Sequence, residues 1–406
     1  MILTVKGYKC LKEEVKMDIN KVNVLWGPMG AGKSSILESL AIFIDILNGR
    51  LKLEGDKISS SSLKHLQGIR FNDLVNLSEK YMSIGVQDLD YLFTITYNKD
   101  SQLFQAKLSS TGREVPIAEI NDLTVDKISE ITKEIREIVL EGKRFIEDRY
   151  GREEKKFIKD VIENAEKQPN IKKYLEGLLK SDFIYISHHR TAPSEIKFGE
   201  FRSITSSRLS SMGENLLDLL FNLVVQRVRE EKVLTELEGC LRSLEIISKQ
   251  PSIEVDLQET FEDSSIRIDG KDIRVLSCGE RNTILLLLGS IIVENNQALI
   301  IEEPEIGIHV INFNKLLSSM LKELEGKNSI LILSTHSPIP LHAFRSKIIK
   351  REVNPKDINF YYIYKEDGKV EIINLKFGNE GRLILTPDAR TTLRSMIDID
   401  LVKNIL

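Results

Sequence analysis

A glycine-rich stretch near the N-terminus combines residue types that hold nucleotide phosphates. It reads Gly-Pro-Met-Gly-Ala-Gly-Lys-Ser over residues 27–34, after an apolar segment at 22–26 and before an amphipathic helix expected over about 33–48. Glycines let backbone N–H groups curl round phosphates, while Lys33 can reach the β and γ oxygens and the Ser34 hydroxyl can bind magnesium. The start of the helix adds a positive field. We therefore expect contacts with ATP and Mg²⁺ at Gly27, Pro28, Gly30, Ala31, Gly32, Lys33, Ser34 and Ser35.

A pair of acids at the end of an apolar run forms the second candidate group. The segment 298–301 is Ala-Leu-Ile-Ile, and Glu302 and Glu303 follow it directly. At the end of a buried strand, one carboxylate can join the shell of a magnesium ion while its neighbour polarises an attacking water. Acids also occur at ordinary solvated strand ends. The phosphate-binding stretch earlier in the chain favours the catalytic interpretation.

Two further motifs are weaker when taken alone. Ser277, Gly279 and Glu280 precede an apolar helix at 282–293, where a Ser-x-Gly can offer hydroxyl and N–H donors to a phosphate or simply cap the helix. A lone histidine, His336, follows an apolar strand at 329–334, and such a histidine is usually structural. The function of both motifs therefore depends on the residues around them.

The elements that must position these residues alternate between strands and helices. Strands are expected at 2–6 and 22–26, and short alternating segments between 81 and 117 predict an antiparallel meander. Residues 122–180 have a helical pattern whose charges alternate in sign, which favours a solvated helical face over a nucleic-acid patch.

The second half of the chain continues the alternation. A strand at 183–187 precedes a long helix at about 214–247, and two strands follow near 253–258 and 264–268. The last expected elements are strands at 298–302 and 329–334 and a helix at about 307–325. This order predicts an α/β fold with a parallel core sheet.

Composition limits the possible classes of protein. With 406 residues and 41% apolar content, the chain can bury a large core and form two or three domains. A net charge of −4 does not support a general affinity for nucleic acid, which would need a local basic surface. The three cysteines show no metal or disulfide spacing and favour a reducing cytosol. No apolar run approaches the roughly 20 residues that a membrane helix needs, so we expect a cytoplasmic protein with no membrane partner.

The order of the motifs resembles that of the ABC-type ATPase superfamily. It is most similar to the prokaryotic branch that contains SMC and RecF heads and the OLD-family ATPases. The segment 3–13 resembles the same branch, and residues 302–309 are similar to the EEPE-x-x-LH element of OLD-like proteins. The resemblance covers residues 1 to about 345. It implies an ABC ATPase head with a mixed or parallel core sheet, an antiparallel β-meander and a short helical insertion.

The resemblance also implies a role for each motif. Lys33 and Ser34 would contact phosphate and magnesium, and Glu302 would be the acid of the metal shell. Glu303 would be the catalytic base and His336 the sensor of the γ-phosphate. The remaining residues form the signature that closes on the ATP of a second copy: Ser277, Gly279 and Glu280.

The chain departs from the family pattern in several places. Met29 replaces a frequent asparagine, and Glu302 is one methylene longer than the usual aspartate. No glutamine of a Q-loop can be assigned, because Gln87 comes too early and the strand at 183–187 leads into the pair His188-His189. That pair could bind metal or nucleotide, although exposed loop histidines more often bind neither.

The additions that mark better-known relatives are absent. The insertion at 122–180 is too short for the long coiled coils of SMC heads and contains no zinc hook, so we expect a compact helical lobe. Too few residues follow Pro338 to form the Toprim nuclease domain of OLD proteins. Asp398 and Asp400 mimic part of such a site, and we interpret them as a solvated helix start.

Four segments and three functions follow. We expect an N-terminal half of the head at 1–121, the insertion at 122–180, a C-terminal half at 181–345 and a tail at 346–406 with short strands and a helix. The favoured function is an ATP-dependent homodimer that acts as a switch for a separately encoded effector or sensor protein, as in phage defence. The alternatives are a RecF- or SMC-like DNA repair ATPase, for which nucleic acid is a possible partner, and a transporter nucleotide-binding subunit, which the helical insertion disfavours.

Overall fold

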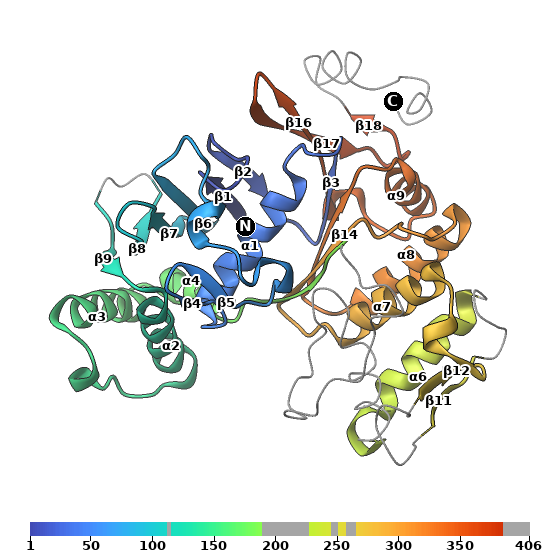
Figure 1. Ribbon diagram of the computed structural model, residues 1–406, viewed down its shortest axis with the longest axis horizontal. Coiled ribbons are helices and arrows are strands. Elements are labelled where there is room, and N and C mark those ends of the chain that lie inside the picture. The colour runs from blue at the N-terminus through green and yellow to red at the C-terminus, as the bar shows by residue number, and fades with distance from the viewer. Residues whose placement is uncertain (112–114, 189–226, 245–250, 257–264, 385–406) are drawn as a thin grey trace. The chain divides into compact units, whose positions relative to one another are not determined.

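The computed structural model describes residues 1–111, 115–188, 227–244, 251–256 and 265–384 (Figure 1). Contacts between residues divide the chain into two compact units. Unit 1 contains Met1–Asn20, Pro28–Phe183 and Tyr362–Ile373, and unit 2 contains Lys21–Gly27, Ile184–Tyr361 and the residues from Asn374 onward. In the described part of the chain, no helix has the length and apolar character needed to cross a membrane.

Unit 1 contains a six-stranded sheet in the order β2-β1-β6-β7-β8-β9, in which every neighbouring pair is antiparallel. The pattern of β7 is typical, because its alternate residues, beginning with Tyr91 and Phe93, are buried and the others face outward. The antiparallel meander expected from the sequence is therefore confirmed, although strand β2 was not foreseen. The strands are β1 (Ile2–Lys6), β2 (Val15–Asp18), β6 (Tyr81–Asp88), β7 (Tyr91–Asn98), β8 (Leu103–Ser110) and β9 (Ala118–Leu123).

Four helices and a small hairpin complete the described part of unit 1. Helix α1 (Lys33–Leu47) is buried along nearly its whole length and packs on β1 and β6. Helices α2 (Val125–Glu141), α3 (Arg152–Lys167) and α4 (Pro169–Leu179) pack against one another as the helical insertion (Figure 1). Their ends follow local rules, since Thr124 caps α2 and Gly142 ends it in a left-handed conformation. The hairpin is β4 (Lys52–Glu54) and β5 (Lys57–Ser60).

Unit 2 contains three parallel strands that carry the candidate site. Strands β14 (Gln297–Glu302) and β15 (Ile330–Thr335) pair in parallel, and β15 pairs in the same way with β3 (Val22–Trp26). All three are almost continuous runs of buried residues, as expected for strands covered on both faces.

These strands belong to a seven-stranded sheet with the order β10-β14-β15-β3-β16-β17-β18. Its last two strands pair antiparallel, so the sheet is mixed and the expected fold class is confirmed. The remaining strands of this sheet are β10 (Asp182–Ile186), β16 (Ile358–Glu366), β17 (Lys369–Phe377) and β18 (Leu383–Ile384).

One helix of unit 2 begins later than the sequence pattern predicted. Helix α8 (Val310–Leu324) was expected from about 307, but Gly307 has a φ of 71° and His309 caps the first turn. Much of the long helix expected over 214–247 lies outside the described residues, which contain α6 (Arg227–Leu244). The other elements are α7 (Cys278–Ile292), α9 (Ile339–Ile349), β11 (Ile253–Asp256), β12 (Ser265–Ile268) and β13 (Lys271–Asp272).

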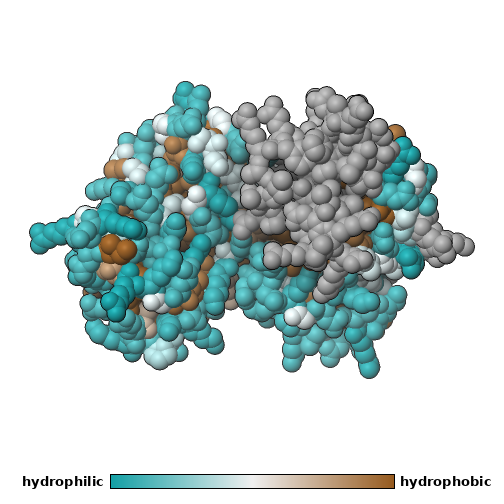
Figure 2. All heavy atoms as spheres, turned by 90° about the horizontal axis from the view of Figure 1, so that it is seen from below, coloured by the Kyte–Doolittle hydropathy of each residue, from teal (hydrophilic) through white to brown (hydrophobic). Residues whose placement is uncertain are grey.

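The surface of the described residues is polar over most of the face shown in Figure 2, and hydrophobic residues appear there in separate small areas. The most exposed large apolar side chains, such as Leu77 and Met29, come from different elements. Single exposed apolar residues are normal in folded proteins.

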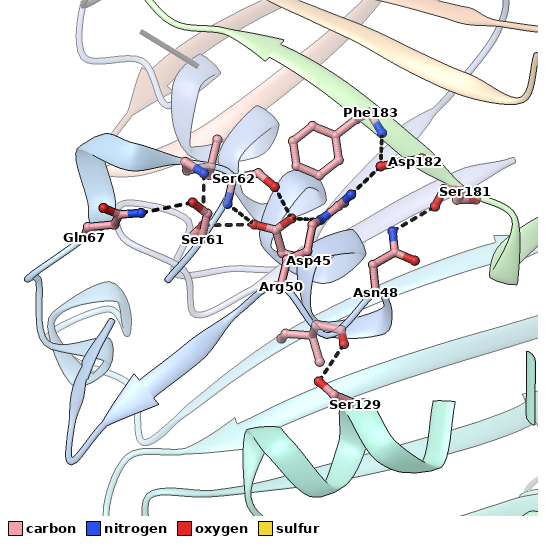
Figure 3. A network of polar contacts seen from close by, with 12 residues as sticks. Asp45, Asn48, Arg50, Ser61, Ser62, Gln67, Ser129, Ser181, Asp182 and Phe183 are labelled. Atoms are coloured by element: carbon pink, nitrogen blue, oxygen red, sulfur yellow. Dashed lines mark hydrogen bonds and ion pairs between the residues drawn. The ribbon is translucent and has the colours of Figure 1, made fainter. Parts of the chain in front are cut away.

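A buried polar network in unit 1 fixes the end of α1 (Figure 3). The carboxylate of Asp45, which is 0% exposed, accepts hydrogen bonds from Arg50 Nε at 2.7 Å, Ser61 Oγ at 2.9 Å and Ser62 N and Oγ, both at 2.7 Å. Arg50 also pairs with Asp182 at 2.6 Å. The network therefore joins the helix that follows the phosphate-binding stretch to the loop after β5 and to the start of β10.

We predict that Asp45→Ala lowers the free energy of unfolding by about 3 to 5 kcal/mol, because it removes the buried carboxylate that accepts hydrogen bonds from Arg50, Ser61 and Ser62. Urea denaturation measures this change. The matched control is Asp100→Ala, since Asp100 pairs with Lys80 at 3.8 Å on the surface and should contribute at most about 1 kcal/mol. Equal effects of the two substitutions would show that the network does not stabilise unit 1.

Candidate functional site

The phosphate-binding stretch forms the turn between β3 and α1. Residues 28–30 are exposed, whereas Ala31, Gly32 and Lys33 are buried. Gly32 has a φ of 105°, and a Cβ there would lie 3.1 Å from Cys10 Sγ. The backbone at this position therefore requires glycine for its conformation and for the space around it.

The first turn of α1 is suited to an anion. It contains no acidic residue, and its N-cap, Gly32, makes no side-chain cap. The backbone N–H groups and the positive end of the helix dipole therefore face no negative side chain of the same turn. Lys33 Nζ donates to Pro28 O at 2.8 Å across the turn. Ser34 is half-buried and supplies a hydroxyl of the kind that magnesium prefers, whereas Ser35 is buried with its Oγ 3.5 Å from Cys10 Sγ.

The buried acid Glu38 lies one helical turn further along α1 and supports the phosphate-binding stretch. Its carboxylate accepts from Tyr8 Oη at 3.2 Å and Lys9 Nζ at 2.5 Å, and it lies 2.8 Å from His65 Nε2. Burial alone would raise the pKa of Glu38, but the hydrogen bond with His65 and the charge of Lys9 lower it below the usual value. Glu38 is thus held as a carboxylate that ties the loop after β1 to α1. The sequence pattern gave no sign of this cluster.

Within unit 2, the three parallel strands end at one edge of the sheet. Glu302 is opposite Ser334, and Thr335 is opposite Trp26. The N–H of Gly27 donates to Thr335 O at 3.3 Å. The first residue of the phosphate-binding stretch therefore lies at the same edge as the two candidate acids, which is where polar side chains gather in parallel sheets.

Glu302 is deeply buried and firmly held. Its exposed fraction is 2%, and its Oε2 accepts from Ser187 Oγ at 3.2 Å and from His188 N at 3.1 Å and lies 2.7 Å from His188 Nδ1. The sequence left the function of His188 open, and the structure places it against the acid assigned to the metal shell. The signal that could have found it is its place two residues after the end of β10, the strand beside β14. His189 and Arg190 lie outside the described residues.

Glu303 and His336 form a pair at the ends of β14 and β15. His336 Nδ1 lies 3.0 Å from Glu303 Oε1, and both side chains are partly exposed. The backbone of Glu303 is left-handed, with a φ of 47°, and its N–H donates to Ser334 O at 2.7 Å. Such strain in a non-glycine residue is typical of functional sites. A partly exposed carboxylate beside an imidazole is suited to accept a proton from water.

The signature motif forms the first turn of α7. Ser277 is the N-cap, because its Oγ accepts from Glu280 N at 3.3 Å and its N–H donates to Glu280 Oε2 at 2.7 Å. This reciprocal arrangement is a capping box, so the helix cap weighed from the sequence is present. The binding of a phosphate by these residues stays a prediction.

The start of α7 packs directly on the turn that follows the two acids. A Cβ on Gly279 would lie 2.2 Å from Gly307 O, and Asn282 Nδ2 donates to Ile306 O at 2.8 Å. Residues far apart in the sequence are thus in backbone contact. A shift of the signature helix must therefore move the turn next to Glu303.

The structure brings Glu302, Glu303 and His336 together at one edge of the parallel strands and places the signature beside the turn that follows them. The phosphate-binding residues from Pro28 onward belong to unit 1. Asp398 and Asp400, which the sequence analysis interpreted as a solvated helix start, lie outside the described part of the chain. The individual roles assigned to all these residues stay predictions.

Comparison with known proteins defines the class. Residues 1–339 match the model of the family described as AAA ATPase domain, so the chain belongs to that family. The structure is similar to an SMC head bound to the C-winged helix domain of ScpA, with 11% identity over 92% of this chain and 97% of that chain and a TM-score of 0.51. This likeness shows the α/β fold with a mixed sheet and an antiparallel sheet.

Two other solved structures are similar at lower scores. The SMC head domain from Thermotoga maritima has 12% identity, covers 92% of this chain and 98% of that chain and gives a TM-score of 0.42. The recombination mediator RecF has 17% identity, covers 92% of this chain and 97% of that chain and gives a TM-score of 0.38. No curated protein matches the chain.

We predict that Gly279→Ala lowers the free energy of unfolding by about 1 to 3 kcal/mol, because the added methyl group cannot fit against Gly307 O. The matched control is Gly177→Ala in α4, where a Cβ meets nothing within 4 Å and alanine should add about 0.5 to 1 kcal/mol. Chemical denaturation of both variants gives the comparison. A gain in stability from both would mean that the close contact with Gly307 is not maintained in solution.

Proposed function

We propose that this protein binds ATP with magnesium and hydrolyses it slowly. The observation that carries the proposal is the shared edge of β14, β15 and β3, where Glu302, Glu303 and His336 gather beside Gly27. The match to the AAA ATPase domain supports ATP as the nucleotide.

Each site residue has its own role in the proposed reaction. Lys33 and the N–H groups at the start of α1 hold the phosphates by charge-assisted hydrogen bonds. Ser34 and Glu302 would hold the magnesium ion, directly or through water. When bound, the ion supplies charge neutralisation to the β- and γ-phosphate oxygens. Glu303 accepts a proton from the attacking water, and His336 donates a hydrogen bond to the terminal phosphate while its Nδ1 faces Glu303.

We further propose that two copies close on two ATP molecules. The signature at the start of α7 has no use within the chain's own phosphate site in this scheme, and it would complete the site of the second copy. A two-fold axis then generates two equal composite sites. Val275 and Ile311, which flank the signature and the turn after Glu303, are 73% and 62% exposed, and burial by a second copy would favour closure.

The biological role that fits such a dimer is a nucleotide switch read by another protein. ATP closes the two copies, hydrolysis opens them, and a separately encoded effector or sensor distinguishes the two states, as in phage-defence systems. The solved SMC head that resembles this chain is bound to a domain of ScpA, which supports a protein partner for heads of this fold. Co-purification of the product of a neighbouring gene only in the presence of ATP would test this role.

We predict that Glu303→Gln retains ATP binding and nearly abolishes hydrolysis, because the amide keeps the shape of the side chain but cannot act as a base. The expected loss in kcat is about 100-fold or more. Calorimetry and phosphate release measure the two properties separately. Lys33→Ala serves as the contrasting variant and should lose ATP binding itself. If Glu303→Gln hydrolyses ATP at the wild-type rate, the assignment of the catalytic base is wrong.

We predict that Ser277→Arg and Lys33→Ala complement each other. Ser277→Arg should bind ATP but fail to close, since the bulky cation fills the place of the second copy's phosphate. A mixed dimer pairs the intact phosphate-binding turn of one variant with the intact signature of the other, which restores about one working site. Phosphate release from the mixture tests this outcome. No activity, in a sample in which mixed dimers are shown to form, would argue for hydrolysis within a single chain.

A further inference from the structure

We propose that Glu305, the third acid after β14, is a positioning residue that holds His336 against Glu303. The inference rests on the proposed hydrolysis of ATP and deepens it. Glu305 itself does not touch His336 or the reacting atoms in this scheme. It acts through Thr335, the last residue of β15.

A chain of hydrogen bonds carries the inference. Thr335 Oγ1 donates to Glu305 Oε1, and Ser337 N donates to Thr335 Oγ1 at 2.9 Å. Thr335 and Ser337 are the two neighbours of His336. A single carboxyl group therefore fixes the backbone on both sides of the histidine, whose Nδ1 lies 3.0 Å from Glu303 Oε1.

The support for Glu305 is rigid. Glu305 follows Pro304, whose ring fixes the φ angle of that proline. The backbone carbonyl of Glu305 accepts a hydrogen bond from Ile308 N at 3.0 Å. The same turn is closed by Ile306 N, which donates to Glu303 O at 3.1 Å. Glu303 and Glu305 are thus parts of one turn, so the hydrogen bond that Thr335 donates to Glu305 sets the distance between Glu303 and His336.

The chemistry of Glu305 differs from that of the two acids before it. The residue is 8% exposed, and burial raises the pKa of its carboxyl, an effect that the hydrogen bond from Thr335 partly opposes. The nearby charge of Glu303 also raises this pKa. In the described part of the chain, Oε2 of Glu305 has no hydrogen-bond partner. A charged carboxylate is costly at such a place, whereas a neutral acid or an amide is tolerated.

This difference gives the inference its test. Glutamine keeps an oxygen that can accept the hydrogen bond from Thr335 Oγ1, so at a positioning residue it should preserve the function. At the catalytic base, the same substitution should remove it. Substitution by glutamine is therefore expected to have opposite effects on hydrolysis at Glu303 and at Glu305.

The first experiment measures kcat and KM for ATP in variants of the full chain. We expect Glu305→Leu to lower kcat about 10- to 100-fold with little change in KM, because the histidine and the base lose their alignment. Glu305→Gln should recover most of that loss. Thr335→Val should resemble Glu305→Leu, Thr335→Ser should recover activity, and the double variant Glu305→Leu/Thr335→Val should be no worse than either single one. Glu325→Leu, at an exposed position after α8, is the control that leaves the rate unchanged.

The second experiment does not depend on hydrolysis. The NMR signal of the His336 ring should shift in Glu305→Leu and in Thr335→Val, and it should stay near its wild-type position in Glu305→Gln. Thr335→Val removes one hydroxyl with little change in volume, so the test survives if Glu305→Leu fails to fold.

The outcomes separate the two proposals. Unchanged kcat and an unchanged His336 signal in Glu305→Leu and Thr335→Val would overturn the positioning role, while an inactive Glu303→Gln would leave the proposed function intact. Normal hydrolysis by Glu303→Gln would overturn the proposed function. In that case the His336 signal still decides whether Glu305 positions the histidine.

Discussion

The parallel pairing of β14, β15 and β3 is the constraint on which the candidate site depends. Parallel strands end at the same edge: Glu302 lies opposite Ser334, and Thr335 lies opposite Trp26. The residues that follow each strand are therefore brought within reach of one another. The pairing is stabilised by the burial of nearly every side chain of the three strands. Without that register, acids that follow one strand could not meet a histidine that follows the next.

The three acids at this edge of the sheet have different surroundings. The Oε2 of Glu302 accepts hydrogen bonds from Ser187 Oγ and His188 N and lies 2.7 Å from His188 Nδ1. Glu305 accepts a hydrogen bond from Thr335 Oγ1, and burial raises the pKa of its carboxyl. Glu303 remains partly exposed in a left-handed backbone conformation. Three carboxyl groups within four residues thus have three different surroundings.

Much of this arrangement was predictable from the sequence, because it follows from local patterns. Apolar runs located β1 and β3 to the residue, and the glycine-rich turn and the paired acids were found by their types and spacing. The contacts of His188 and Glu305 were not predictable, since they join residues 114 and 30 positions away along the chain, and no period connects them. The same reason hid the cluster around Glu38. The start of α8 was misjudged because a glycine turn and a histidine cap delay the helix beyond the apolar pattern.

The measurement that tests the central claim most directly is the release of inorganic phosphate from ATP by the purified full-length chain as magnesium is titrated. If the edge of the parallel strands is a hydrolysis site, release should be slow, should rise with magnesium to a plateau and should stop when the metal is chelated. Tight binding of ATP with no release of phosphate at any magnesium concentration would contradict the claim, and it would leave the edge as a binding site alone.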